Sequence, residues 1–275
     1  MIITKENFNE KSLRRLQLSH LEILDEVVRI CDKYGLKYYL AEGTLLGAVR
    51  HKGHIPWDDD LDIAMPRKDF NKFAELCKSE LADKFLFQFT STFKNHYLPF
   101  AKVRNQNTVF NEYNIRNLDV PKGIYIDIFP IDNTKKVNSI SRGIRTKLLK
   151  KLSFSITAKV GFEHKSSFMH NFVLFLLKPF SANQLSKFRD YLMTIENNDK
   201  NPYYINFASY QMRNKEFFPK SYFGEGVMLE FEGKLYRAPI EYDKILTCRY
   251  GDYMQLPSVE DRVLKHKPEY IDFGD

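Results

Sequence analysis

The N-terminal part of the chain alternates between helical and strand-like hydrophobic patterns. Apolar residues recur at helical spacing over residues 12–34, and Gly35 supplies a stop, so the pattern predicts one long helix. The aromatic segment 37–41 predicts a short strand. Residues 42–44 then turn into a second, short helix that ends near Arg50. This order predicts a strand and a helix joined by a tight turn.

Further strands are expected after this short helix. Residues 51–59 include a glycine and a proline and are predicted to form a loop. The next strand is expected over residues 60–65, and apolar residues at helical spacing from Phe70 to Leu81 predict a helix that covers the sheet. Three more strands are predicted near residues 85–89, 100–104 and 123–129.

The composition changes after about residue 135, where basic and apolar residues mix without strand-like alternation. This segment is expected to be a mainly helical insertion. After it, a hairpin is predicted around residues 232–234, followed by a short helix over residues 242–250 and a polar tail. The sequence thus predicts an α+β (α/β) fold, a mixed β-sheet flanked by helices, in three parts: residues 1–134, 135–201 and 202–275.

Composition narrows the class of protein. The chain has 43% hydrophobic and 28% charged residues, close to the averages for globular proteins. Its three cysteines form no CxxC pair and its N-terminus has no apolar leader, so a cytoplasmic protein is expected. The apolar run FVLFLL is too short to span a bilayer. A net charge of +7 favours polyanionic partners but equally fits a solvated basic surface, and no nucleic-acid motif is present.

Two acids on one predicted strand are the first candidates for chemistry. Side chains alternate along a strand, so Asp60 and Asp62 would share a face while Leu61 and Ile63 pack beneath. Two neighbouring carboxylates repel each other, and a divalent cation between them removes that penalty. Because no thiolate or paired histidine lies nearby, the expected ion is Mg²⁺ or Mn²⁺.

A third acid, Asp127, interrupts an otherwise apolar strand. An unpaired buried charge costs several kcal/mol, about 3–5 in typical cases, so this carboxylate should have a metal or a cationic partner. The alternative to metal binding is a buried ion pair with an arginine. The presence of Asp60 and Asp62 favours a metal site that includes all three acids.

Gly43 and Thr44 stand at the mouth of the predicted short helix. A glycine lets the backbone approach a phosphate, and the free amides of a first helical turn bind anions. The Thr44 hydroxyl could contribute another hydrogen bond. The alternative for this dipeptide is an ordinary helix cap.

These residues together resemble a known superfamily. A Gly-Ser or Gly-Thr turn, an Asp-x-Asp strand and a later acid are typical of nucleotidyltransferases, which predicts a nucleotidyltransferase-like sheet. The segment YLAEGTLLGAVRHKGHIPWDDDLDIAM at residues 39–65 resembles the LicD family more specifically, to which fukutin-related proteins are also similar. The run YGDYMQLP at residues 250–257 resembles the C-terminal segment of that family.

The resemblance implies a metal-dependent phosphotransferase. The expected donor is a nucleotide diphosphate-alcohol, CDP-choline in the typical case, and the expected acceptor is a glycan or lipid-linked glycan such as teichoic acid or lipopolysaccharide. Asp60 and Asp62 would hold Mg²⁺, and Asp127 would complete a second ion site or act as a base. Two alternatives stay open: a nucleotidyltransferase that uses a nucleoside triphosphate, and an inactive binding module of the same fold.

Several other residues are candidates for substrate binding. Arg50, Lys102 and Arg104 are expected to contact phosphate, since a guanidinium can grip it with two hydrogen bonds. The alternative for Lys102 is a solvated strand edge. Asp58 and Asp59 are candidate outer-shell acids or polar loop residues, and the loop role is favoured for Asp59. His266 stands where the family often has neighbouring histidines, of which only one is kept here.

The insertion adds an expectation about membranes. A basic stretch, RTKLLKK, precedes the apolar FVLFLLKPF within residues 145–180. Such a segment could make peripheral contact with an anionic membrane surface, because each lysine or arginine near it contributes about 1 kcal/mol. Helices that only pack on the catalytic core are the alternative.

Overall fold

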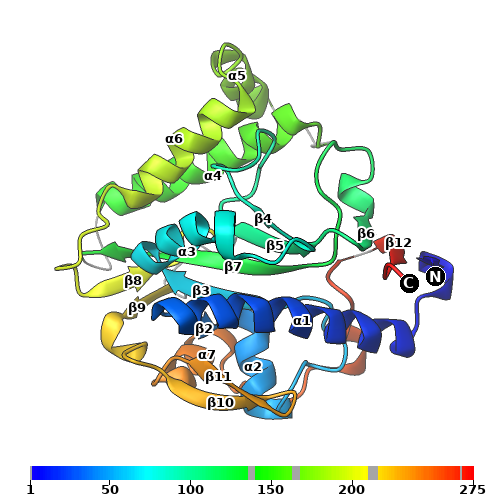
Figure 1. Cartoon of the computed structure of the whole chain (residues 1–275). Helices are drawn as coiled ribbons and strands as arrows, with labels where there is room; N and C mark the ends of the chain where they lie inside the picture. Colours follow the sequence, from blue (N-terminus) through cyan, green and yellow to red (C-terminus); the bar gives the residue numbers. More distant parts are fainter. Residues whose placement is uncertain (1, 136–139, 163–167, 210–215, 267) are drawn as a thin grey trace.

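The computed structural model describes residues 2–135, 140–162, 168–209, 216–266 and 268–275. Its centre is a mixed sheet with the strand order β2-β3-β7-β5-β4, extended by β8 and β9 (Figure 1). Within this sheet of described residues β3 and β7 pair in parallel, whereas the other neighbours are antiparallel. The strands of this sheet are β2 (Tyr39–Leu40), β3 (Asp62–Pro66), β4 (Phe85–Gln88), β5 (Ala101–Asn105), β7 (Tyr125–Thr134), β8 (Tyr203–Ile205) and β9 (Phe217–Pro219). The mixed α+β architecture predicted from the sequence is confirmed.

The long helix α1 (Glu10–Tyr34) crosses one face of this sheet (Figure 1). The Asn9 side chain accepts a hydrogen bond from the Ser12 amide at 3.1 Å, which caps the start of the helix. Gly35 ends it with a left-handed φ of 64°, which a glycine adopts without strain. The sequence prediction of a helix over residues 12–34 is confirmed.

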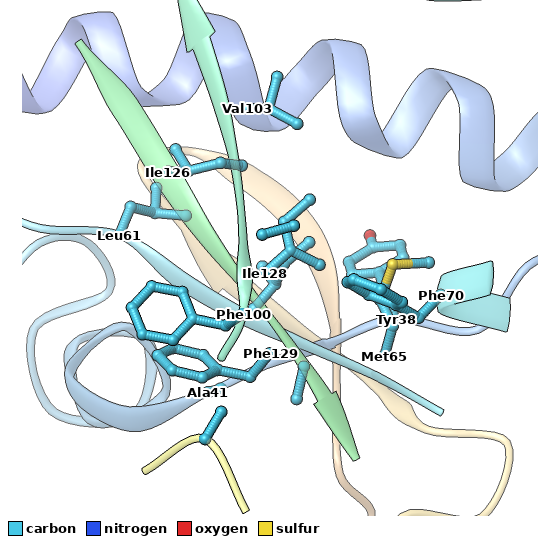
Figure 2. Packing of buried hydrophobic residues seen from close by; sticks show 14 of the residues in the cluster. Tyr38, Ala41, Leu61, Met65, Phe70, Phe100, Val103, Ile126, Ile128 and Phe129 are labelled. Atoms are coloured by element: carbon cyan, nitrogen blue, oxygen red, sulfur yellow. The ribbon is translucent and has the colours of Figure 1, made fainter. Parts of the chain in front are cut away.

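Helix α3 (Arg67–Glu80) packs on the same side of the sheet as α1. Val103 and Ile126 point toward α1, whereas Phe100 and Phe129 pack against each other on the opposite face (Figure 2). Side chains alternate along a strand, so Asp127 lies on the same face as Phe129. The acids therefore occupy the face that α1 and α3 leave uncovered.

The remaining elements surround this core. Helix α2 (Glu42–His51) follows β2 as predicted, and the predicted hairpin is formed by β10 (Val227–Phe231) and β11 (Lys234–Ala238). Helix α7 (Tyr242–Tyr250) has the predicted bounds. The insertion is helical, as expected, and contains α4 (Ile140–Val160), α5 (Phe168–Leu176) and α6 (Ala182–Thr194) at one end of the molecule (Figure 1).

The prediction of a polar tail was wrong. The chain end forms β12 (Pro268–Asp272), which lies between β1 (Ile2–Thr4) and β6 (Val109–Glu112) in a small antiparallel sheet. Both termini therefore meet on one side of the molecule (Figure 1). This pairing brings the segment just before β12 back to the acids, because the end of the chain is held in place.

Candidate active site

Asp62 and Asp127 lie side by side on two neighbouring strands of the candidate site. They are direct Cα partners in the parallel pair β3 and β7, and both are buried. Burial, with repulsion from Asp60 and Asp127, raises the pKa of the Asp62 carboxyl well above its usual value. Burial also raises the pKa of Asp127, even though the neighbouring Lys102 opposes that shift. Both carboxyls therefore lie in surroundings that disfavour their charged form.

Asp60 lies outside the strand to which the sequence analysis assigned it. Strand β3 begins at Asp62, so the expectation that Asp60 and Asp62 alternate within one strand was wrong. The amide of Asp62 instead donates to the Thr44 hydroxyl at 2.8 Å, so the first strand residue is bonded to the α2 turn rather than preceded by more strand. Asp60 still acts on Asp62 electrostatically and raises its pKa.

Gly43 and Thr44, in the first turn of α2, hold Asp58 and Asp62 in place. A Cβ at Gly43 would lie 2.5 Å from Asp58 Oδ2, so only a glycine admits the Asp58 carboxylate here. The Thr44 hydroxyl accepts the hydrogen bond from Asp62 and is buried. Anion binding by this turn stays a prediction, while its observed contacts hold Asp58 and Asp62 in place.

Lys265 was missed by sequence reasoning. Its Nζ lies 3.1 Å from Asp58 Oδ1 and 3.3 Å from Asp60 Oδ2, so this ammonium joins the two loop acids. Burial disfavours its charge, but Asp60, Asp58 and Asp62 outweigh burial and raise the pKa of Lys265. For Asp58 the order is reversed, because burial and Asp60 outweigh Lys265 and raise the pKa of the carboxyl to about 7.

His266 pairs with Asp59. Its amide donates to Asp59 Oδ2 at 3.0 Å, and its Nδ1 lies 3.3 Å from Asp59 Oδ1. Burial opposes the charged ring, yet the Asp59 hydrogen bond and the charge of Glu112 raise the pKa of His266 to about 9. A polar loop role was expected for Asp59. The structure buries it instead and makes it the anchor of the C-terminal segment.

The three basic residues proposed for phosphate differ in their surroundings. Lys102 Nζ lies 2.6 Å from Asp127 Oδ1 and 3.2 Å from the centroid of the Tyr125 ring. Asp127 thus forms the buried ion pair that was the alternative to metal binding, but its partner is a lysine and not an arginine. Arg104 is buried and donates to the Gln88 side chain and to the Gly123 carbonyl, so its contacts are structural.

Arg50 lies at the edge of a pocket beside the acids. Its guanidinium donates to the Tyr253 carbonyl at 2.7 Å, which ties α2 to the segment after α7. The pocket has a volume of about 660 Å³, within the usual range for small-molecule sites. Its wall includes Gly43, the charged residues Arg50, Asp58 and Lys265, and the aromatic rings of Trp57, Tyr250 and Tyr253.

The donor atoms at this site suit a hard divalent cation. Within the part of the chain that the structure describes, no three His, Cys, Asp or Glu side chains are arranged to hold an ion as they stand. The carboxylates are engaged by lysines, Asp127 by Lys102 and Asp60 by Lys265. Burial nevertheless disfavours the charge of Asp62 and Asp127 and raises the pKa of both, and carboxylate oxygens are the ligands that Mg²⁺ and Mn²⁺ prefer.

Comparisons with known proteins identify the family of the chain. Residues 35–155, which run from just before β2 into α4, match the family described as LicD/FKTN/FKRP, nucleotidyltransferase domain. The lipopolysaccharide cholinephosphotransferase LicD of Haemophilus influenzae is 31% identical over 264 residues, which cover 94% of this chain and 96% of that protein. The chain therefore belongs to the LicD family.

Two shorter matches fall on part of the chain. Human ribitol 5-phosphate transferase FKRP is 39% identical over 54 residues, which cover 20% of this chain and 11% of that protein. The uncharacterized protein RP689 of Rickettsia prowazekii is 46% identical over 52 residues, or 19% of this chain and 20% of that protein. These matches are local, whereas the similarity to LicD extends over nearly the whole length of both chains.

Proposed function

We propose that this protein transfers a phosphoalcohol, in particular phosphocholine from CDP-choline, to a hydroxyl of a cell-surface glycan such as lipopolysaccharide or teichoic acid. The observation that carries the proposal is the meeting of Asp60, Asp62 and Asp127 beside a pocket of about 660 Å³. The names of the full-length relative LicD and of FKRP support transfer of a phosphoalcohol.

The carboxylates would hold Mg²⁺ or Mn²⁺ together with the donor diphosphate. The bound ion would supply positive charge beside the phosphate oxygens during displacement at phosphorus. Asp127 could accept the proton of the acceptor hydroxyl, because burial already raises its pKa. Lys265 and Lys102 lie beside the same acids and could neutralise charge on the leaving nucleotide.

The pocket offers groups suited to a cationic alcohol. Trp57, Tyr250 and Tyr253 line it together with Asp252 and Asp261. Aromatic faces attract a quaternary ammonium, and nearby carboxylates add to that attraction. Arg262 already lies 4.9 Å from the centroid of the Trp57 ring, so this ring accepts a cation in the present structure.

The proposal is tested with purified protein, Mg²⁺ and a panel of cytidine diphosphate alcohols. Release of cytidine monophosphate that depends on a glycan acceptor and is greatest with CDP-choline is expected. Pyrophosphate release from a nucleoside triphosphate would instead identify a nucleotidyltransferase. Absence of both reactions, and of Mg²⁺ binding measured by calorimetry, would identify an inactive binding module and overturn the proposal.

A further inference from the structure

The positive charge of the protein is concentrated in the insertion. Residues 135–201 contain 13 lysines and arginines but only 4 acidic residues, whereas the rest of the chain has 29 basic and 31 acidic residues. The net charge of +7 therefore comes entirely from this segment. The insertion forms the end of the molecule at the top of Figure 1, where α5 projects beyond α4 and α6.

An apolar groove opens between these three helices. Its volume is about 610 Å³, and each helix contributes to its wall. Apart from Lys151 and Gln184, its lining is apolar: Leu148 and Leu152 of α4, Val173, Leu176, Leu177 and Phe180 in and after α5, and Leu185 and Phe188 of α6. No helix of the described residues is long and apolar enough to cross a membrane.

Large apolar side chains around the groove face solvent. Phe175 is 71% exposed, Leu176 is 55% exposed and Tyr191 is 63% exposed. Exposed apolar patches of this kind mark interaction surfaces more often than ordinary surface. Other exposed apolar residues are Ile144 and Leu148 of α4, Phe172 of α5 and Phe188 of α6, with Phe180 before and Ile195 directly after α6.

Other residues than these exposed ones hold α6 against the core. The buried guanidinium of Arg189 on α6 donates to the carbonyls of Tyr97 and Leu98, at 2.6 and 2.5 Å. Ser186 donates to the His96 carbonyl at 3.0 Å on the same side of the helix. Because the inner side of α6 makes these bonds, the outward side is available for a partner.

We propose that this end of the insertion docks on an anionic phospholipid bilayer. Five exposed lysines lie on the helices that form the groove or in the connection between them: Lys147, Lys150, Lys151, Lys178 and Lys187. Exposed apolar side chains would enter the interface, and the ammonium groups would meet the lipid phosphates.

A second copy of the chain is a poorer occupant. A twofold contact through this face would bring the same lysines of two molecules together, and like charges at an interface repel. An anionic lipid surface matches both the apolar groove and the charge. The inference is independent of the proposed reaction, because it concerns residues outside the candidate active site.

Vesicle co-sedimentation of the full-length protein tests the proposal. Vesicles of phosphatidylglycerol and phosphatidylcholine in equal parts are compared with phosphatidylcholine alone, at low and at high ionic strength. The charge-reversal variant K147E/K150E/K151E is compared with K11E/K68E/K72E, which reverses three exposed lysines on α1 and α3. The apolar variant F175S/L176S is compared with M228S/L235S on the β10 and β11 hairpin.

The wild-type protein and both control variants should bind the anionic vesicles at low ionic strength. K147E/K150E/K151E should bind about tenfold or more weakly, and added salt should weaken the wild type. F175S/L176S should also bind more weakly while its thermal unfolding stays that of the wild type, since the altered side chains are exposed. Equal binding by all variants, or equal binding to neutral vesicles, would overturn the proposal. The proposal would also be overturned if the wild-type protein did not bind vesicles but formed a dimer that F175S/L176S abolishes.

Discussion

Asp62 on β3 and Asp127 on β7 are direct partners in the parallel pair of strands at the centre of the sheet. Each is buried, and burial raises the pKa of each carboxyl. Lys102 pairs with Asp127, yet two adjacent buried carboxylates still weaken a fold unless a further positive group reaches them. We therefore interpret this pair as part of the proposed metal site and not as a source of stability.

Loss of a site carboxylate should abolish activity without unfolding the protein. D60N and D62N each remove a charge at constant size, so we expect turnover to fall by about a hundredfold or more at saturating Mg²⁺. D62N should also leave the metal-free protein at least as stable, because repulsion from Asp127 is relieved. D119N, at an exposed position, is the control. Near-wild-type turnover in D60N or D62N would exclude the metal assignment.

Thr44 provides a test of how the turn positions the acids. T44V removes the acceptor for the buried Asp62 amide, which should lower the free energy of unfolding by about 1–3 kcal/mol and reduce turnover. T44S keeps a hydroxyl and should retain most of the free energy of unfolding and most of the turnover. Denaturant unfolding and turnover are measured for the pair. Equal values for T44V and T44S would mean that the hydroxyl does not hold β3.

Lys265 should compete with a metal ion for the acids. Its ammonium lies beside Asp58 and Asp60, so K265M leaves both without this counter-ion. The metal-free variant should be less stable by at most about 1 kcal/mol, because the Lys265 side chain is half-exposed. Mg²⁺ should then raise the melting temperature more in K265M than in the wild type. K68M, on α3, is the matched control, and an equal Mg²⁺ effect in all three proteins would contradict competition.

Buried histidines should make the fold sensitive to acid. Burial lowers the pKa of His96 to about 3, so the folded protein keeps this ring neutral while the unfolded chain protonates near pH 6.5. The contribution of the neutral His96 ring to the free energy of unfolding is fully present above pH 6.5. It is lost as the pH falls toward 3, by about 1.4 kcal/mol per pH unit. His20 and His54 also have lowered pKa values and add to this slope.

The measurement is the free energy of unfolding in denaturant between pH 7 and pH 5. H96Q cannot be protonated but can still donate to the Phe100 carbonyl, as His96 Nε2 does at 2.8 Å. Its slope with pH should be smaller than that of the wild type. Parallel pH profiles for the two proteins would show that His96 is not the group responsible.

Local patterns in the sequence determined most of the elements. The helical spacing of apolar residues and the stop at Gly35 predicted the bounds of α1 closely. The aromatic segment predicted β2, the turn after it predicted α2, and the apolar positions at helical spacing predicted α3. These predictions succeed because capping, turn chemistry and side-chain periodicity act over a few residues. The acids were also found locally, since an aspartate within an apolar strand is conspicuous wherever that strand packs.

Only the tertiary structure decided which groups meet those acids. Lys265 reaches Asp60 across 205 positions of sequence, and although its neighbour His266 was a candidate through the family resemblance, no local pattern predicts this contact. The contact depends on β12 pairing between β1 and β6, and strand pairing over such distances is set by packing of the whole chain. Arg104 and Lys102 alternate in sequence, yet Lys102 neutralises Asp127 while Arg104 bonds Gln88 and Gly123. The sequence by itself therefore determined the acids and the strands of Asp62 and Asp127, and long-range packing determined the cations that meet them.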